Sequence, residues 1–370
     1  MYLYVIFSLL SLLAFADIFT SPSQRTPRYT IVFVFTIFLL FILSSLRVER
    51  GTDWGSYELY FDLSTWDFEG WMEPGFTLLN KLVYACIPHF VALSFCISLF
   101  IYLLKPQIIY RFSPYPFVAL LAWYVITLAD IFPVRQTLAS AILLYSIRYV
   151  IEKRFFPFLL LVILASSIHA TSIVFFITYF VFYRRFSRLF LLSIFVGSFV
   201  FAFVAEGFMG DLLSGINNEF IQERIEKYLS VGVDETFGSV YSTQGILIRG
   251  FLNRSIIMFM VLSVMNSLRK EDCILNGWVN LFTLASILFA VFASVNVALG
   301  RISVFFDMSQ IFLFSYFFKW KMTPMSRFIL FGLLLVYFGY RFYGVINNYY
   351  DLYVPYKSLF WNIHMPVLVG

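Results

Sequence analysis

Long apolar runs, each near the length needed to cross a bilayer, recur from one end of the sequence to the other. Because a helical span needs about 20 residues at about 1.5 Å per residue, these runs are candidate spans. They cover residues 2–19, 30–46, 90–104, 115–132, 134–150, 155–182, 189–204, 246–268, 277–298, 302–318 and 328–344. Only 13% of the residues are charged, against about 25% in soluble domains. The sequence therefore predicts an all-α, polytopic transmembrane helical bundle of about 11–12 membrane segments, with residues 1–370 forming a single integral membrane domain.

Basic and acidic residues are concentrated in different connecting segments. Fifteen of the 26 lysines and arginines, with only three acids, lie in the short loops at 21–29, 105–114, 148–154, 183–188, 269–276 and 319–327. The longer connections 47–75 and 205–245 each hold seven acids and two basic residues. Since short loops rich in Lys and Arg stay in the cytoplasm, we expect residues 47–75 and 205–245 to be the first and second extracytoplasmic loops.

The segment 155–182 lies between two basic loops, so both of its ends are expected on the cytoplasmic side. Its 28 residues are too few to cross about 30 Å of hydrocarbon twice. We therefore predict a short broken membrane hairpin that turns around residues 166–172, with His169 at its tip. Non-helical backbone at that depth must be covered by protein or line a wet cavity. The alternative is one long tilted span, which would reverse the orientation of every later segment.

A few ionisable residues fall close to the predicted hydrocarbon region, where charge is costly and usually marks a function, a partner or an interface position. Arg135 follows Pro133 in an outer turn; it either pairs with Asp130 to hold that turn or binds a ligand. Arg301 follows Gly300 at the start of another span and is either a structural anchor or a functional group. His169 is either a core histidine with a satisfied hydrogen bond or a participant in chemistry.

The first outer loop combines arginines, carboxylates, glycines and many aromatic residues. One interpretation is a solvated acidic loop, but its aromatic content favours a loop that packs on the membrane face or holds a sugar. The predicted topology places six charged residues on the outer face, with His169 reachable from the same side: Arg47, Arg50, Asp53, Glu73, Arg135 and Arg301. Guanidinium groups suit a pyrophosphate because each offers a planar two-pronged fork, and a nearby carboxylate suits activation of a sugar hydroxyl.

Several common catalytic motifs are absent from the sequence. There is no Gly-x-Gly-x-x-Gly after a strand, no P-loop and no His-Glu-x-x-His. No Asp-x-Asp pair is present that would hold a metal on a nucleotide sugar, and Asp67-Phe-Glu69 is only a weak approximation. Cys86, Cys96 and Cys273 have no metal or redox spacing. We therefore expect no metal site and disfavour a cytosolic nucleotide-sugar enzyme.

A set of short motifs, in order along most of the chain, resembles the EpsG family of Wzy-type exopolysaccharide and O-antigen polymerases. The motifs are Arg50-Gly-Thr-Asp-Trp54 with Tyr57, Glu73-Pro-Gly-Phe76 with Asn80, Arg135-Gln-x-x-Ala139, Ala165-Ser-x-x-His169-x-Thr171, Gly300-Arg301 and Pro355-Tyr356. Each motif alone is weakly specific, and Trp54 stands where a tyrosine is expected.

The resemblance implies a multi-pass protein of the bacterial inner (cytoplasmic) membrane with a GT-C-like helical architecture. It further implies a metal-independent glycosyltransferase without a cofactor that polymerises undecaprenyl-pyrophosphate-linked oligosaccharide repeat units at the periplasmic or extracellular face. Arg135 and Arg301, with Arg47 or Arg50, would bind the pyrophosphate. Asp53 is the first candidate for the base, followed by Glu73 and then His169. Substrate contacts are also expected for Tyr57 and Gln136.

The partners expected on this basis are the lipid-linked oligosaccharide, membrane lipids, and a chain-length regulator and flippase, with no nucleic acid. Two other classes remain open. A flippase or transporter for a lipid-linked glycan would also need arginines near a pyrophosphate. Another membrane transferase, either an O-antigen ligase or an acyltransferase that uses His169, is chemically related.

Overall fold

The computed structural model describes residues 2–20, 25–205, 243–268, 273–295 and 299–362. Most of these residues are helical, and the only β-type pairing among them is an isolated bridge between Arg47 and Ser358. Six described helices are long and apolar enough to cross a membrane: α2 (Pro27–Ser45), α5 (Phe90–Phe112), α10 (Arg188–Ala205), α14 (Thr243–Leu268), α15 (Cys273–Val295) and α18 (Pro324–Asn347). The prediction of an all-α, polytopic membrane protein is confirmed. Most of the predicted second outer loop, residues 206–242, lies outside the described residues.

The other predicted spans also coincide with helices, but shorter ones. They are α1 (Tyr2–Ile18), α6 (Pro116–Thr127), α7 (Arg135–Ile151), the broken series α8 (Phe155–Ile168), η3 (Ala170–Ile177) and α9 (Thr178–Val181), and the broken series η4 (Leu299–Ser303), α16 (Val304–Asp307) and α17 (Ser309–Phe317). The break in the first series falls at His169, whose φ of −149° and ψ of 104° are those of extended backbone. The structure therefore breaks the helix where the sequence predicted a turn.

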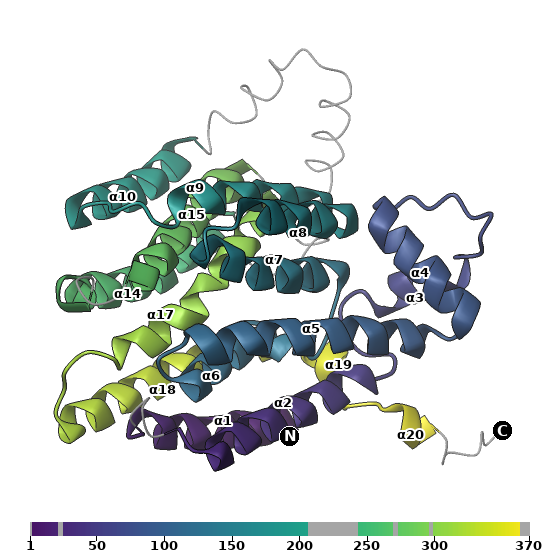
Figure 1. The fold of residues 1–370 in the computed structure, drawn as a ribbon, viewed down its shortest axis with the longest axis horizontal. Helices are drawn as coiled ribbons and strands as arrows, with labels where there is room; N and C mark the ends of the chain where they lie inside the picture. The colour runs from purple at the N-terminus through teal and green to yellow at the C-terminus, as the bar shows by residue number, and fades with distance from the viewer. Residues whose placement is uncertain (1, 21–24, 206–242, 269–272, 296–298, 363–370) are drawn as a thin grey trace. The chain divides into compact units, whose positions relative to one another are not determined.

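The chain forms two compact units, Met1–Phe176 with Lys321–Gly370, and Ile177–Trp320; Figure 1 shows their helices. In the first unit, α6 is buried on every side from Pro116 to Val125 and packs against α1, α5 and α18. It begins at Pro116, whose missing N–H costs nothing at the first helical position. The Tyr124 hydroxyl donates to the carbonyl of Leu3 in α1 at 2.7 Å. A helix that is apolar all round needs this central position.

A left-handed turn ends α6 earlier than the sequence predicted for the span 115–132. The φ angles of Leu128, Ala129 and Asp130 are 53°, 51° and 57°. The left-handed region costs a non-glycine residue about 1–2 kcal/mol, so the surrounding structure must hold the turn in place. The Tyr102 hydroxyl in α5 donates to the carbonyl of Ala129 at 2.7 Å, and all three turn residues are buried.

The same turn is tied to α5 by a buried ion pair. The Lys105 ammonium contacts the Asp130 carboxylate, and both side chains are almost fully excluded from solvent. The indole N–H of Trp123 donates to the same carboxylate at 3.2 Å. The assignment of residues 105–112 to a loop was therefore wrong, because they form the last turns of α5. Of the two alternatives for Arg135, the pair with Asp130 is excluded, because Asp130 pairs with Lys105.

In the second unit, α15 packs against α10, α14, η4, α16 and α17. Trp278 of α15 stacks on Phe312 of α17 with ring centroids 3.8 Å apart. The Asn280 side-chain amide donates to the carbonyls of Val181 and Arg184, each at 2.8 Å. Those bonds satisfy backbone carbonyls at and just after the end of α9, where no further helical turn follows to donate N–H groups to them.

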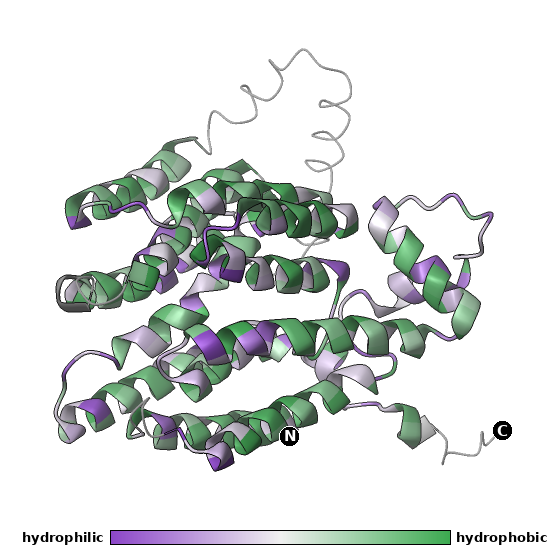
Figure 2. Cartoon of the chain, viewed as in Figure 1, coloured by the Kyte–Doolittle hydropathy of each residue, from purple (hydrophilic) through white to green (hydrophobic). Residues whose placement is uncertain are grey.

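The long helices expose many large apolar side chains, as expected for surfaces that face lipid tails. Figure 2 shows hydrophobic residues covering most of α2, α10, α14 and α18. Phe201 in α10, Phe259 in α14 and Val336 in α18 are each at least half exposed. A membrane-spanning helix can present such residues outward because lipid is as apolar as the side chain.

Candidate functional site

The first predicted outer loop contains two short helices, α3 (Trp54–Asp62) and the beginning of α4 (Pro74–Cys86). Its aromatic side chains pack on one another: Tyr60 contacts Trp71 edge to face, with centroids 4.9 Å apart, and also contacts Phe68 and Phe76. Tyr60 itself is fully buried. The loop is therefore folded and packed, in contrast to a merely solvated acidic loop.

Glu73, directly before α4, joins three segments that are far apart in the sequence. One carboxylate oxygen forms an ion pair with Arg135 at the start of α7. The other accepts from the backbone N–H of Ala170 at 3.0 Å and lies 3.5 Å from Nδ1 of His169. These four residues, Glu73, Arg135, His169 and Ala170, are called the Glu73 cluster below. The side chains of Glu73, Arg135 and His169 are 19–27% exposed, so the cluster remains open to a ligand.

Local sequence explains why these segments meet. Gly75 allows the start of α4 to approach the end of α8, because a Cβ at this position would lie 2.2 Å from the Ser167 hydroxyl oxygen. The end of the helix at His169 leaves the N–H of Ala170 without a helical acceptor, and Glu73 supplies one. Arg135 is the first residue of α7, and the left-handed turn and Pro133 before it fix where that helix begins.

The environment of Glu73 favours its charged form. Burial raises the pKa of its carboxyl. The hydrogen bonds from His169 and Ala170 and the charge of Arg135 outweigh burial and lower the pKa to about 2. A carboxylate with so low a pKa holds a positive group in place well, but it accepts a proton weakly at neutral pH. Glu73 is therefore better suited to positioning Arg135 than to acting as a base.

We expect the contribution of Glu73 to stability to depend on pH. Its pKa is lower in the folded protein than the ordinary value of 4.5, so the contribution is complete above about pH 5 and is lost as the pH falls toward about 2. The difference in Tm between wild type and Glu73→Gln in detergent should stay constant from about pH 8 to about pH 5 and then shrink. Glu69→Gln, at an exposed acid of the same loop, is the control. A difference that stays unchanged down to about pH 3 would contradict this assignment.

Arg47 is buried, with 4% of its surface exposed, and its guanidinium is committed to the protein. It donates to the backbone carbonyls of Arg50 and Pro133 and lies over the rings of Trp54 and Phe132. Burial lowers the pKa of Arg47 to about 10, so it stays charged at neutral pH. Arg47 thus fixes the outer loop against the Pro133 turn. Because both of its terminal nitrogens donate to backbone carbonyls, its guanidinium has little capacity to bind a ligand.

Gly51 makes this arrangement possible. Its φ of +112° lies in the region that favours glycine, and a Cβ there would lie 2.6 Å from Nη1 of Arg47. The next arginine, Arg50, donates to the carbonyl of Asp351 at 2.8 Å. Arg47 and Arg50 therefore both link the outer loop to other parts of the first unit.

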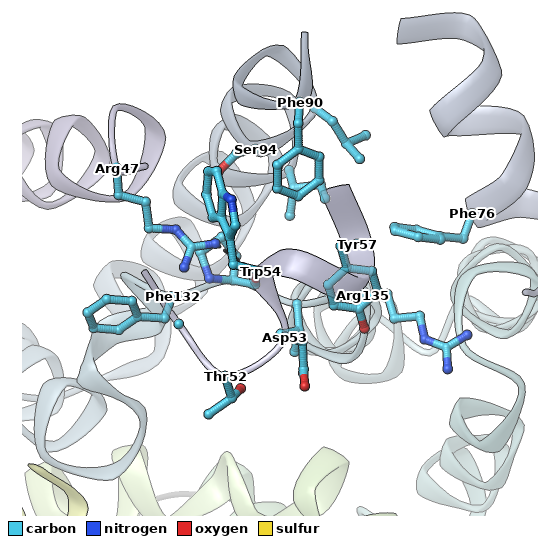
Figure 3. Close-up of a pocket in the computed structure, with 15 residues that line it drawn as sticks. Arg47, Thr52, Asp53, Trp54, Tyr57, Phe76, Phe90, Ser94, Phe132 and Arg135 are labelled. Carbon is cyan, nitrogen blue, oxygen red and sulfur yellow. Dashed lines mark hydrogen bonds between the residues drawn. The ribbon is translucent and has the colours of Figure 1, made fainter. Parts of the chain in front are cut away.

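A small pocket lies beside the Glu73 cluster, lined by residues of α3, α5 and the Pro133 turn. Figure 3 shows Arg47 on one side of Trp54, and Asp53, Tyr57 and Arg135 on the other. The cavity volume is about 20 Å³, which is room for about one water molecule. Asp53 is exposed and makes no helix-capping hydrogen bond. Burial raises the pKa of Tyr57 above its ordinary value, although the charge of Arg135 opposes the shift. Tyr57 is therefore a neutral hydrogen-bonding group next to Arg135.

Arg301 belongs to the second unit, where it is exposed on η4. The segment after it is fixed by Asp307, which accepts from Arg254 at 2.7 Å, from the Gln310 amide at 2.8 Å and from the Ser303 hydroxyl at 3.1 Å. Arg254 also lies over the Phe289 ring, 4.0 Å from its centroid. The segment that carries Arg301 is thus held by partly buried hydrogen bonds to Asp307.

Within the first unit, the structure brings together most of the residues that the sequence singled out. Glu73 contacts both Arg135 and His169, and Asp53 and Tyr57 line the adjoining pocket. Gln136 follows Arg135 in the first turn of α7 and is partly exposed. Sequence reasoning missed Lys105 and the N–H of Ala170. A lysine inside a helix-length apolar run was a signal that could have found Lys105.

Among the described residues, no three His, Cys, Asp or Glu side chains converge as a metal site would require. A protein-family model described as the EpsG family matches residues 30–358. No curated protein and no solved structure matches the chain. The GT-C-like architecture therefore stays a prediction.

Proposed function

Because the chain belongs to the EpsG family, a family of Wzy-type polysaccharide polymerase-like membrane proteins, we propose that it joins lipid-linked oligosaccharide repeat units into a surface polysaccharide. The substrates in this proposal are repeat units on undecaprenyl pyrophosphate, and the reaction takes place on the extracytoplasmic face of the bacterial inner membrane. The active centre is the Glu73 cluster with the adjoining pocket.

The observation that carries the proposal is the contact of Glu73 with Arg135 and His169. Three motifs that resemble the family pattern, at residues 73, 135 and 169, are separated by 62 and 34 positions in the sequence. They meet in one partly exposed cluster beside the Asp53 pocket. The charged side chains of the cluster are 19–27% exposed and accessible to a ligand, whereas those of Lys105 and Asp130 are almost fully buried.

In the proposed reaction, the growing chain on its pyrophosphate carrier is the donor. A hydroxyl oxygen of the incoming repeat unit attacks the anomeric carbon of the donor sugar, and the bond from that carbon to the pyrophosphate oxygen breaks. The bonding electrons leave with the pyrophosphate, which stays on its lipid. The hydroxyl proton passes to a base, for which we propose the Asp53 carboxylate, because it is exposed, lines the pocket and is not paired with Arg135 as Glu73 is.

Arg135 stabilises the charge that develops on the leaving pyrophosphate. Only one of its terminal nitrogens pairs with Glu73, and a guanidinium has five N–H donors, so it can hold Glu73 and a phosphate oxygen together. Donors fixed in advance at the position of developing charge are among the largest contributions to catalysis. Arg301, which is exposed on η4 of the second unit, stays a predicted pyrophosphate ligand on the basis of the family resemblance alone.

Asp53→Asn tests the role of the base. Loss of a general base typically lowers the rate by about 10²–10⁴-fold, so cells that carry this variant should accumulate single repeat units in place of a ladder of long chains. The measurement is a gel of surface polysaccharide from a strain whose own gene is deleted and complemented. Asp62→Asn, at an exposed acid at the end of the same helix α3, should restore the ladder. A normal ladder from Asp53→Asn would exclude Asp53 as the base.

A further inference from the structure

An apolar groove lies between α2 and α5 in the first unit, away from the Glu73 cluster. Its cavity volume is about 560 Å³. The walls are formed mainly by Phe33, Ile37 and Phe41 of α2 and by Tyr102, Leu103 and Pro106 of α5. Pro106 has no N–H to donate, so its turn of α5 lacks one backbone hydrogen bond.

One end of the groove is polar and basic. Thr30 and Tyr110 line it there and share a hydrogen bond of 2.7 Å. Arg111 also lines this end, with 58% of its side chain exposed. Arg25 lies 5.8 Å from the centroid of the Tyr110 ring, and the exposed Arg28 is two residues before Thr30. The only acid paired with these arginines among the described residues is Glu152, at 3.7 Å from Arg111.

We propose that this groove binds one anionic phospholipid of the bilayer, with an acyl chain between α2 and α5 and its phosphate at Arg111. A lipid chain gains little by moving from the bilayer into an apolar groove, since the two environments are equally apolar. Selection must therefore come from the headgroup. Arg111, which lines one end of the groove, and Arg25, which lies beside Tyr110 at that end, favour a negatively charged headgroup. Basic pockets between helices, on the side that carries the Lys and Arg loops, are suited to such headgroups.

This lipid site is independent of the proposed polymerase reaction, because none of its residues belongs to the Glu73 cluster or its pocket. The chain itself offers a matched pair of arginines for a test. Arg111 and Arg154 both pair with Glu152, at 3.7 and 3.8 Å, and their side chains are 58% and 59% exposed. Only Arg111 lines the groove.

The experiment uses the full chain, delipidated in detergent and incubated with phosphatidylglycerol or phosphatidylcholine that carry identical acyl chains. Native mass spectrometry then measures the lipid retained per protein. We expect wild type to retain phosphatidylglycerol preferentially. Because a basic residue near a headgroup contributes about 1 kcal/mol, Arg111→Gln should lower that preference about fivefold. Arg154→Gln should leave it unchanged. Val34→Trp, which fills the groove from a position that faces lipid, should lower retention of both lipids.

Three results would overturn the proposal. The first is equal retention of the two phospholipids by wild type. The second is an equal loss of preference in Arg111→Gln and Arg154→Gln, which would show attraction to general surface charge. The third comes from a parallel incubation with a polyprenyl monophosphate: if that lipid is retained through Arg111 and displaces phosphatidylglycerol, the groove holds the carrier lipid instead. Size-exclusion profiles identical to wild type show that each variant is folded.

Discussion

Replacing Arg135 with alanine is expected to abolish long polysaccharide chains while leaving the protein folded and inserted in the membrane. Removing one preorganised donor to developing negative charge costs about 10²–10³-fold in rate. A loss of that size leaves single repeat units on the acceptor in a gel of surface polysaccharide. Arg135→Lys keeps the charge but loses the planar fork, so shorter and fewer chains than wild type are expected.

Arg154→Ala is the matched control for this experiment. Arg154 lies just beyond the opposite end of α7 from Arg135, and its side chain is 59% exposed. It should give a normal ladder of chain lengths. Since Arg135→Ala leaves Glu73 without its ion-pair partner, the amount of each variant in the membrane is measured alongside. A normal ladder from Arg135→Ala would remove Arg135 from the proposed site.

Replacing Lys105 with methionine is expected to lower the free energy of unfolding by about 3–5 kcal/mol, because it leaves the buried Asp130 carboxylate without its positive partner. The effect is large because both side chains are almost fully buried and because Asp130 belongs to the left-handed turn that precedes Arg135. The measurement is the thermal unfolding midpoint in detergent, together with the yield of monodisperse protein.

The double variant Lys105→Met with Asp130→Asn separates the lost charge pair from lost packing. Asparagine tolerates the left-handed conformation of residue 130 and carries no charge to leave unpaired. We therefore expect the double variant to be more stable than Lys105→Met alone. If the two losses of stability simply add, the residues do not act as a pair. A Lys105→Met protein as stable as wild type would show that the ion pair does not hold the turn.

The long helices of this protein could be predicted because each depends on a local property, an apolar run of sufficient length. The helices α2, α5 and α15 follow from such runs. The end of α5 does not, because Lys105 lies inside the helix and the helix continues to Phe112. The end of α6 could not be predicted in this way. Leucine and alanine at positions 128 and 129 disfavour the left-handed region, and the turn is held by tertiary contacts from Tyr102, Lys105 and Trp123.

The candidate site was predicted in part. Charge placed in apolar surroundings and motif resemblance identified Glu73, Arg135 and His169, but not their contacts. Of the two alternatives for Arg135, a pair with Asp130 is excluded because Asp130 pairs with Lys105. The Glu73–Arg135 pair depends on tertiary contacts that no local pattern records. The burial of Arg47 was also unpredictable, since it depends on the rings of Trp54 and Phe132 from two separate segments.

Elongation by purified protein tests the central claim most directly. The full chain is reconstituted in liposomes with the undecaprenyl-pyrophosphate-linked repeat unit, and the products are separated by chain length. Wild type is predicted to form a ladder of multiple repeat units and to release undecaprenyl pyrophosphate, one molecule for each new linkage, while Arg135→Ala forms neither. Two results would contradict the proposal that the Glu73 cluster is the centre of a polysaccharide polymerase. One is movement of intact single units across the bilayer without any new linkage, and the other is equal elongation by wild type and Arg135→Ala.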